Sequence, residues 1–507
     1  MPDCVVARAF NIKQCLLMTP LLARSLSSQY GSPSAFRSEQ EDIIIYELGA
    51  RHISAGFAGE SRPRCVVYFN PERDRRLGDY RACDSSYRRK RRKIGDVHEW
   101  SKEYELYRVD LKSIDLGLVE DRLERAVRTI QIDHLQLDQK ARKAALVVPS
   151  LLPTPLLDIA MRVLFNYSTQ PPSIVLLTTP VMACVGAGLR NAIVVDVGWE
   201  ETVVTAVGEY KEVFQRRSVR AGRTLVTEMS RLLEEEVKNG TTSPGDETSD
   251  TGIDFEYAEE VTQRMAWCRA RSHKASNAEA GGMTKLPAPE SASGPRGHIH
   301  LPFTRLSKPA ENAFFAPLDS SGDDDHSTPI HTLVYRVLLA LPVDLRAICM
   351  SRIIVTGGVS ALPGLKPRLL EEVSEIIAKR GWDPVDNYGS VAGRHPRKLQ
   401  ERSANIAGNR QQEELEVPLS PTKKPIQESV RHADRIHDDK YDSITLKAER
   451  EAAKGKAEVI KGTVRGVETV GAWAGASLVA ASKVKGVHEV EREAFLKHGY
   501  RDGGVVI

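Results

Sequence analysis

The stretch IIIYELGARHISAGFAG, residues 43–59, decides the fold that we expect for this chain. Its two apolar runs, 43–46 and 53–58, have the length and composition of β-strands. The turn Gly49-Ala50-Arg51 between them carries a glycine, which permits the tight backbone that a hairpin needs. The stretch therefore predicts a β-hairpin.

A second turn of the same kind lies farther along the chain. The residues Asp196-Val197-Gly198-Trp199-Glu200 connect two apolar runs, 192–197 and 202–207. Backbone N–H groups at such turns form concave sites for anions. Two hairpins of this kind, one in each of two domains, can therefore clamp the phosphates of a nucleotide.

Short apolar runs alternate with amphipathic segments in the rest of the ordered-looking chain. Such alternation indicates an α/β architecture. Further strands are expected at 145–148, 174–177 and 353–356, and helices at 119–130, 156–165 and Thr224–Val237.

These motifs, taken in their order and spacing, resemble the actin superfamily. The resemblance extends to the run AGFAG at 55–59, to PVDLR at 342–346 and to GAWAGASL at 471–478. It covers about half of the chain, in the segments 43–70, 118–236, 301–371 and 464–495. It implies an actin-like α/β fold, in which two RNase-H-like domains surround a nucleotide cleft, with disordered inserts.

Several positions depart from what the resemblance would supply for ATP hydrolysis. Hydrolysis requires an in-line water and Mg²⁺ organised around the phosphates. By resemblance, an acid near the metal, a small hydroxyl residue, a phosphate lysine and a water-positioning glutamine are all replaced. The degenerate positions are Glu47, Ala50, Arg51, Ser54, Thr179 and Trp199. We therefore expect negligible ATPase activity, no catalytic residue and no dedicated metal ligand.

Nucleotide binding is a separate question, because it needs less of this arrangement than hydrolysis does. The resemblance implies ATP or ADP, with Mg²⁺, as a structural ligand that bridges the two domains. Alternatively, the glycines only maintain tight turns, and Trp199 either fills part of the phosphate cleft or merely caps a strand. The candidate nucleotide-binding residues are Gly49, Asp196, Gly198, Gly222, Arg264, Gly357 and Gly358.

The chain is expected to divide into ordered and polar stretches. An actin-like first half at 41–240 contains a divergent basic insert at 65–115, and the second half follows at 241–379. The remaining segments are a disordered leader at 1–40 (or, alternatively, a transit peptide), flexible loops at 239–252, 272–300 and 318–328, a disordered insert at 380–440, and a helix with an actin-like C-terminal segment at 441–507.

The insert at 65–115 stands where actin, by resemblance, has a small subdomain with its pointed-end contact loop. It carries the basic run Arg88–Lys93 instead. A subunit altered on one face would end a head-to-tail filament rather than extend it. This combination most resembles the divergent actin-related proteins (10 or 11 class) at the pointed end of the fungal dynactin complex. The implied partners are an actin-like filament subunit and the other pointed-end subunits, with dynein reached indirectly.

Two alternatives remain open at this stage. If Arg88–Lys93 acts as a nuclear localisation signal, the protein is instead an actin-related subunit of a chromatin-remodelling complex. An active ATPase of the same superfamily is disfavoured by the two altered turns.

The composition limits the remaining function classes. The chain has 507 residues, 41% of them hydrophobic, and a net charge of +3. This near-neutral charge argues against a general nucleic-acid binder. The seven cysteines are widely spaced and contain no CxxC, which is typical of a reducing compartment. No run approaches the roughly 18–20 apolar residues of a membrane span. The cysteines therefore favour the cytoplasm, and the resemblance to actin implies a cytoskeletal location there.

Overall fold

The computed structural model describes the two predicted halves of the chain and the segments that connect them. The described residues are 43–71, 99–138, 140–166, 170–240, 253–271, 282–288, 297–316, 325–382, 463–484 and 486–500. The predicted leader at 1–40, the basic run Arg88–Lys93 and nearly all of the predicted insert at 380–440 lie outside the described residues.

The first half is built on a six-stranded sheet that begins with the predicted hairpin. Its strands lie in the order β13-β5-β4-β1-β2-β3. The strands β1, β2 and β3 form an antiparallel meander, whereas β4 and β5 run parallel to β1. The bounds are β1 Ile43–Leu48, β2 His52–Phe57, β3 Cys65–Tyr68, β4 Lys143–Val148, β5 Ser173–Thr178 and β13 His488–Glu491.

The second structural half repeats this topology in a five-stranded sheet. Its strands begin at Ala192, within the stretch 41–240 that was assigned to the first half, so the predicted boundary at 240 was wrong. The strand order is β12-β11-β6-β7-β8, with an antiparallel β6-β7-β8 meander and β11 parallel to β6. The bounds are β6 Ala192–Val197, β7 Thr202–Gly208, β8 Lys211–Ser218, β11 Ile353–Thr356 and β12 Gly466–Val467. The shared order of a three-stranded meander followed by parallel strands is the duplication that the resemblance implied.

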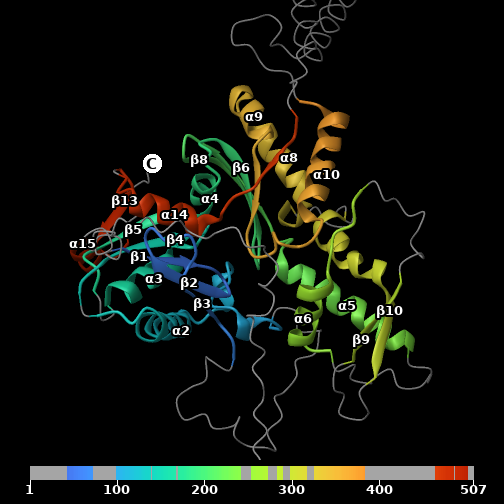
Figure 1. Ribbon diagram of the computed structural model, residues 1–507, viewed down its shortest axis with the longest axis horizontal. Helices are drawn as coiled ribbons and strands as arrows, with labels where there is room; N and C mark the ends of the chain where they lie inside the picture. Colours follow the sequence, from blue (N-terminus) through green and yellow to red (C-terminus); the bar gives the residue numbers. More distant parts are fainter. Residues whose placement is uncertain are drawn as a thin grey trace, which may run out of the picture.

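Helices cover both faces of each sheet (Figure 1). In β1, Tyr46 and its alternate neighbours face one core, while Ile45 faces another. Both faces of the strand are therefore buried, which explains its unbroken apolar run. The helices around the two sheets are α2 Leu116–Thr129, α3 Thr154–Asn166, α4 Thr179–Gly186, α8 Ile330–Ala340, α9 Val343–Met350, α10 Leu365–Arg380, α14 Ala472–Ala481 and α15 Arg492–His498.

The pair α4 and α14 forms the layer between the two sheets. Together with residues of β1, β4, β6 and β11, these helices build one core, to which Trp473 of α14 belongs. The two helices pack closely because they carry small residues. A Cβ added at Gly475 of α14 would lie 1.9 Å from the Met182 carbonyl oxygen of α4.

A separate group of elements in the second half lies at the opposite end of the molecule from α8, α9 and α10 (Figure 1). It consists of α5 Gly222–Gly240, α6 Phe255–Met265, β9 Met283–Pro287 and β10 His298–Pro302. The strands β9 and β10 pair antiparallel, from Met283 opposite Pro302 to Pro287 opposite His298. The prediction of a loop throughout 272–300 was therefore wrong for these strands, because two short strands with polar exposed faces carry a weak apolar signal.

The remaining regular elements are single turns. They are η3 Lys102–Tyr104, η4 Leu111–Ser113, η5 Ile130–His134, η6 Phe303–Ser307, α7 Lys308–Ala310, η7 Glu311–Phe315 and η8 Asp325–Ser327. Within the described part of the chain, no helix is both long and apolar enough to cross a membrane.

The other predicted elements are confirmed with small changes of boundary. The runs at 192–197 and 353–356 match β6 and β11, and the helix expected at 119–130 is α2. Its start is explained by Asp115, whose carboxylate accepts hydrogen bonds from the N–H groups of Gly117 and Leu118. Residues 441–462, where the helix at the start of the C-terminal segment 441–507 was expected, lie outside the described residues.

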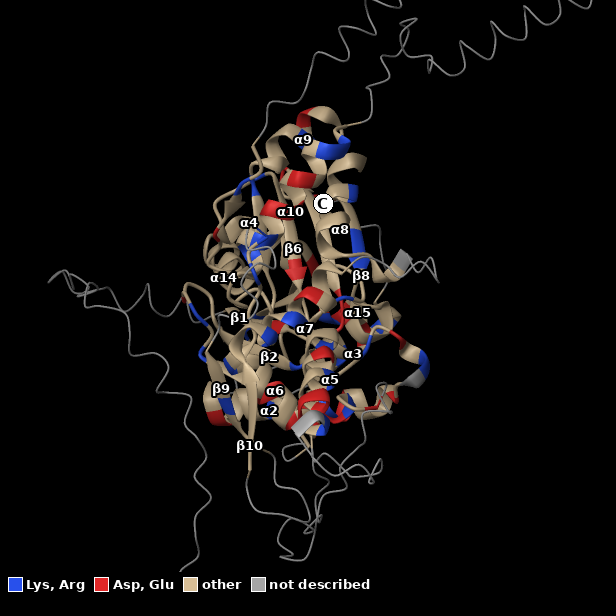
Figure 2. Ribbon diagram, turned by 90° about the vertical axis from the view of Figure 1, so that its right-hand side faces the viewer, with Lys and Arg blue, Asp and Glu red and all other residues tan. Residues whose placement is uncertain are grey.

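Charged residues are mixed along both halves. In the view of Figure 2, Lys and Arg alternate with Asp and Glu over many elements instead of collecting on one face. The elements seen in this view thus carry both signs of charge, in line with the near-neutral composition.

The contact between α4 and α14 gives a test of the fold. We expect Gly475→Ala to destabilise the protein by about 3 kcal/mol, because the new methyl group overlaps a backbone oxygen that cannot move freely. Gly282→Ala is the matched control, since no atom lies within 4 Å of the added Cβ there. Thermal unfolding measures both, and equal Tm values for the two variants would contradict this packing.

Candidate functional site

The turn of the first hairpin connects β1 and β2 and lies between the two halves, in the region where the resemblance places a nucleotide cleft; we call this region the cleft. The N–H of Gly49 donates to the carbonyl of His52 at 2.9 Å. A Cβ at Gly49 would lie 3.1 Å from the same oxygen, so the tight turn itself accounts for this glycine. The carbonyl of Ala50 accepts a hydrogen bond from the N–H of Leu106 at 2.7 Å. The first turn is therefore engaged by the segment that follows β3.

The turn of the second hairpin connects β6 and β7. The N–H of Gly198 donates to the Glu201 carbonyl at 3.1 Å, again closing the turn. The carbonyls of Gly198 and Trp199 accept from Gly222 and Arg223 at 3.0 and 2.8 Å. The second turn is thus fixed against the start of α5.

Side chains meet between the two turns. The Arg51 guanidinium lies 4.3 Å from the centre of the Trp199 ring. It also forms a bidentate ion pair with Glu259 of α6, in which Nη1 donates to Oε1 and Nη2 donates to Oε2 at 3.0 Å. The Trp199 indole Nε1 donates to Glu105 at 2.6 Å. Two of the degenerate positions, Arg51 and Trp199, therefore contact each other across the cleft.

The segment 99–113, which returns from the predicted insert, crosses the same cleft. Trp100 and Tyr104 pack in the second-half core with Phe255 of α6, at ring-centroid distances of 5.1 and 4.6 Å. Leu106 and Tyr107 are buried in the first-half core. We call 99–113 the strap, because its two ends are buried in different halves. The strap lies within 65–115, which was interpreted as a divergent basic insert, but this part of the segment contributes buried aromatic and aliphatic side chains.

Glu105 is the polar centre of the strap. Its side chain is almost fully buried and accepts hydrogen bonds from Arg108, Ser101 and the Trp199 indole. The carbonyl of Glu105 also accepts from Arg122 of α2. A buried carboxylate needs such partners, and here Ser101 and Arg108 of the strap and Trp199 of the second turn supply them.

The candidate glycines of the second half have different surroundings. A Cβ at Gly222 would lie 3.0 Å from the Trp199 ring and from Val359. Gly357 has a φ of 93°, and its Cβ would lie 2.4 Å from the Asp196 carboxylate, so backbone packing requires this glycine. No atom lies within 4 Å of a Cβ at Gly358. Arg264 is exposed and pairs with Glu260 of its own helix, so its role beside a base stays a prediction.

The other degenerate positions are engaged in the fold. Ser54 is buried in β2, opposite Glu47 of β1. Thr179 begins α4, and its hydroxyl donates to the Val148 carbonyl at 3.1 Å. Neither side chain supplies the ammonium or the amide that the resemblance places at these positions.

Acidic side chains gather at the base of the two turns. Burial, together with the nearby Asp196, raises the pKa of Glu47 to about 7. Burial raises the pKa of Asp196 to about 6 and that of Glu201 to about 7. Burial also raises the pKa of Glu200, whose carboxylate accepts from the strap N–H of Val109 at 2.7 Å. These groups hold protons in a pH range where ordinary carboxylates are charged.

The residues present fit a magnesium nucleotide poorly. The Trp199 ring lies against Gly222, a position that by resemblance approaches the ribose. The Arg51 side chain joins the two turns that would clamp phosphates. Among the described residues, no group of three or more His, Cys, Asp or Glu side chains could hold a metal ion. The expected ATP or ADP therefore stays a prediction that this geometry does not favour.

Sequence reasoning missed the partners of Arg51 and Trp199. Tyr104 and Glu105 lie in a stretch that was interpreted as an insert, and no helix was expected at α6. Two signals could have found them. The segment 98–107 is rich in aromatic residues, and Asp254 precedes apolar residues at helical spacing, where its carboxylate caps α6.

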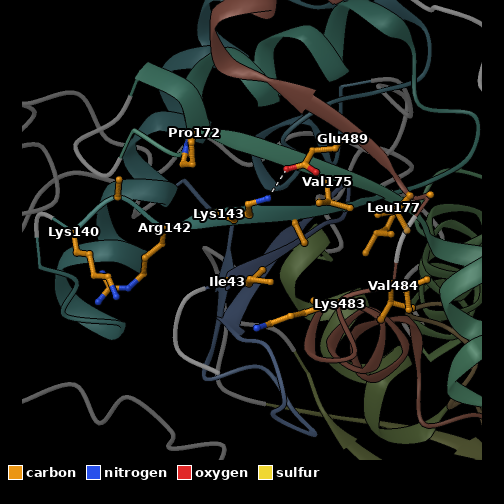
Figure 3. A pocket seen from close by; sticks show the side chains of 16 residues that line it. Ile43, Lys140, Arg142, Lys143, Pro172, Val175, Leu177, Lys483, Val484 and Glu489 are labelled. Carbon is orange, nitrogen blue, oxygen red and sulfur yellow. Dashed lines mark hydrogen bonds and ion pairs between the residues drawn. The ribbon is translucent and has the colours of Figure 1, made fainter. Parts of the chain in front are cut away.

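A cavity of about 650 Å³ lies outside the cleft, between the edge of the first sheet and the end of α14. Lys143 of β4 and Glu489 of β13 pair at its wall at 2.8 Å, while Lys483 lies on the opposite side (Figure 3). Its floor includes Val175 and Leu177 of β5. The cavity contains none of the predicted site residues.

The raised carboxyl pKa values predict how stability depends on pH. A carboxyl whose folded pKa lies above its unfolded value stabilises the fold at low pH, and this contribution is lost as pH rises through the folded pKa. We expect the free energy of unfolding to fall between about pH 5 and about pH 8, with Glu47 contributing on the order of 2 kcal/mol.

Glu47→Gln should flatten this dependence and raise the Tm at about pH 8. Glu124→Gln is the control, because Glu124 is exposed and pairs with Arg128 on the outside of α2. Thermal unfolding across the pH range measures both variants. An unchanged slope in Glu47→Gln would show that this carboxyl does not carry the effect.

Comparison with known proteins gives two findings. A 68-residue segment is 38% identical to the SWI/SNF and RSC complexes subunit arp42 of Schizosaccharomyces pombe, and it covers 12% of this chain and 16% of that protein. The family model described as Actin matches residues 38–268 and 298–395. The match covers well over half of the chain and includes both hairpins, the strap, α5 and α6, and the chain belongs to the actin family.

Proposed function

We propose that this chain is a non-catalytic structural subunit that caps the pointed end of the actin-like filament of dynactin in the cytoplasm. Its partners would be the terminal filament subunit and the other pointed-end subunits, and through them it would support dynein-driven transport and nuclear positioning. The observation that carries the proposal is the strap, which lies across the cleft in the part of the chain where actin, by resemblance, has its pointed-end subdomain.

The geometry after β3 supports an altered pointed-end face. β3 ends at Tyr68, and the chain returns at Glu99 to form two short turns, η3 and η4, before α2. In the described part of 65–115, β3 is the only strand, and it belongs to the main sheet. The returning residues are buried between the halves instead of forming a separate layer. A subunit whose described pointed-end region is rearranged in this way would present an altered face to the next subunit of a head-to-tail filament.

The face around α14 supports the other half of the proposal. Three exposed apolar residues lie on or beside this helix: Val470, Leu478 and Val484, which are 70%, 54% and 48% exposed. A contiguous patch of such residues would suit a protein contact. α14 lies away from α5 and α6 (Figure 1), so a filament could be received on one face while the other face is altered.

The absence of catalysis is proposed from the positions that would organise water and phosphate. Thr179 offers a hydroxyl that is already bonded to Val148, and Ser54 is buried in β2. Trp199 replaces an acid and lies against Gly222. In-line attack on a phosphate requires a positioned water and organised charge, and these residues supply neither.

A nuclear role is the second candidate, and one observation favours it. The segment similar to the subunit arp42 links this chain to a protein named for the SWI/SNF and RSC complexes. The similarity spans only 16% of that protein. We rank this candidate below the dynactin subunit because the short segment carries no information about the altered pointed-end face.

The subunits that co-purify with the tagged, natively expressed protein distinguish the two candidates. We expect the shoulder and filament subunits of dynactin, together with a cytoplasmic signal for a fluorescent fusion. Recovery of a remodelling ATPase with a steady nuclear signal would contradict the dynactin proposal and support the second candidate.

Restoring a single acid should not restore hydrolysis. Trp199→Asp reintroduces the acid of the second turn, but Ser54 and Thr179 remain, so we expect no phosphate release above background from either the wild type or the variant. A phosphate-release assay with purified actin as the positive control measures this. Turnover by the wild-type protein would contradict a non-catalytic role.

A further inference from the structure

We propose that the two halves of this protein are held closed by its own side chains, without a nucleotide. The strap, together with a clasp made by Arg51, Trp199, Glu256 and Glu259, takes the place of the bridging ligand. The inference does not depend on which complex contains the protein.

The clasp joins residues that are far apart in the sequence and belong to different halves. Arg51 extends from the first turn and forms the ion pair with Glu259 of α6. The side chains of this pair are only 18% and 16% exposed. Shielding from water and the bidentate geometry make such an ion pair stronger than an ordinary surface ion pair.

Aromatic rings surround the same guanidinium. Its centre lies 4.3 Å from the ring centre of Trp199 and 5.4 Å from that of Phe255, both in the second half. A cation over an aromatic face is attracted by the electron density of the ring. Arg51 thus contacts α6 through the Glu259 carboxylate and the Phe255 ring, and it contacts the second turn through the Trp199 ring.

The strap also bridges the cleft, because nearby residues of one continuous backbone segment contact its two sides. Tyr104 donates its hydroxyl hydrogen to Glu256 and packs against Phe255. Two residues later, the N–H of Leu106 bonds to Ala50 of the first turn. Opening the cleft would therefore expose the Tyr104 ring to water or break the Leu106 hydrogen bond. Either change opposes opening.

These contacts have a functional consequence. A ligand shifts a conformational equilibrium only when it binds the two states with different affinity. If the closed state is already held by the clasp and Trp199 occupies the space beside Gly222, a nucleotide has little to gain by closing the cleft. The subunit would then present the same surfaces to its partners whatever the ATP concentration.

The neighbouring residues Glu259 and Glu260 provide a matched test. Glu259 pairs across the cleft with Arg51, whereas Glu260 pairs with the exposed Arg264 of its own helix, with exposures of 69% for Arg264 and 56% for Glu260. We expect Glu259→Gln to increase backbone hydrogen exchange in 99–109 by about tenfold, since a shielded charged contact is lost. Glu260→Gln should leave this exchange unchanged.

Tyr104→Phe removes the hydroxyl contact with Glu256 but keeps the aromatic ring, and it should give a smaller increase in the same peptides. In a parallel measurement, roughly 1 mM Mg-ATP should leave the Tm of the wild type unchanged, although a ligand with Kd far below this concentration would raise it. Heat-denatured protein should release no ATP or ADP.

Three results would overturn the inference. The first is equal exchange in Glu259→Gln and Glu260→Gln. The second is a Tm that rises with Mg-ATP, and the third is near-stoichiometric nucleotide released from the purified protein.

Discussion

The contact of Arg51 with Trp199 and Glu259 is the interaction on which this account of the molecule depends. It joins the first turn to the second turn and to α6, where the actin fold would by resemblance place the phosphates. In this geometry the Arg51 charge is paired with Glu259, and the guanidinium and the indole ring lie together between the two turns. The two substituted positions thus form one contact, because the Trp199 ring provides the aromatic face on which the Arg51 guanidinium lies.

The strap also connects the two halves, through its backbone. In its sequence, a basic stretch gives way to aromatic and acidic residues, and in the structure these residues are buried in both halves. One chain segment thereby contacts both halves in the region that, by resemblance, carries the pointed-end subdomain. Under the two proposals above, an altered filament face and independence from nucleotide would both follow from this segment and the Arg51 contact.

The sequence alone was sufficient to predict the strands and helices of the two sheets, but not the side-chain contacts in the cleft. Runs such as 192–197 and 353–356 predicted strands with accurate limits, because strands buried on both faces are continuously apolar. The partners of Arg51 could not be predicted, since contacts between residues separated by some 200 positions depend on tertiary packing. The strands β9 and β10 were missed because alternating exposed polar residues resemble a loop.

An experimental structure of the purified protein, determined in the presence of Mg-ATP at a resolution that defines side chains, tests the central claim most directly. The account predicts that the Trp199 ring lies against Gly222 and that Arg51 reaches Glu259, with no nucleotide between the two turns. A nucleotide bound there, with Trp199 and Arg51 turned away, would contradict it.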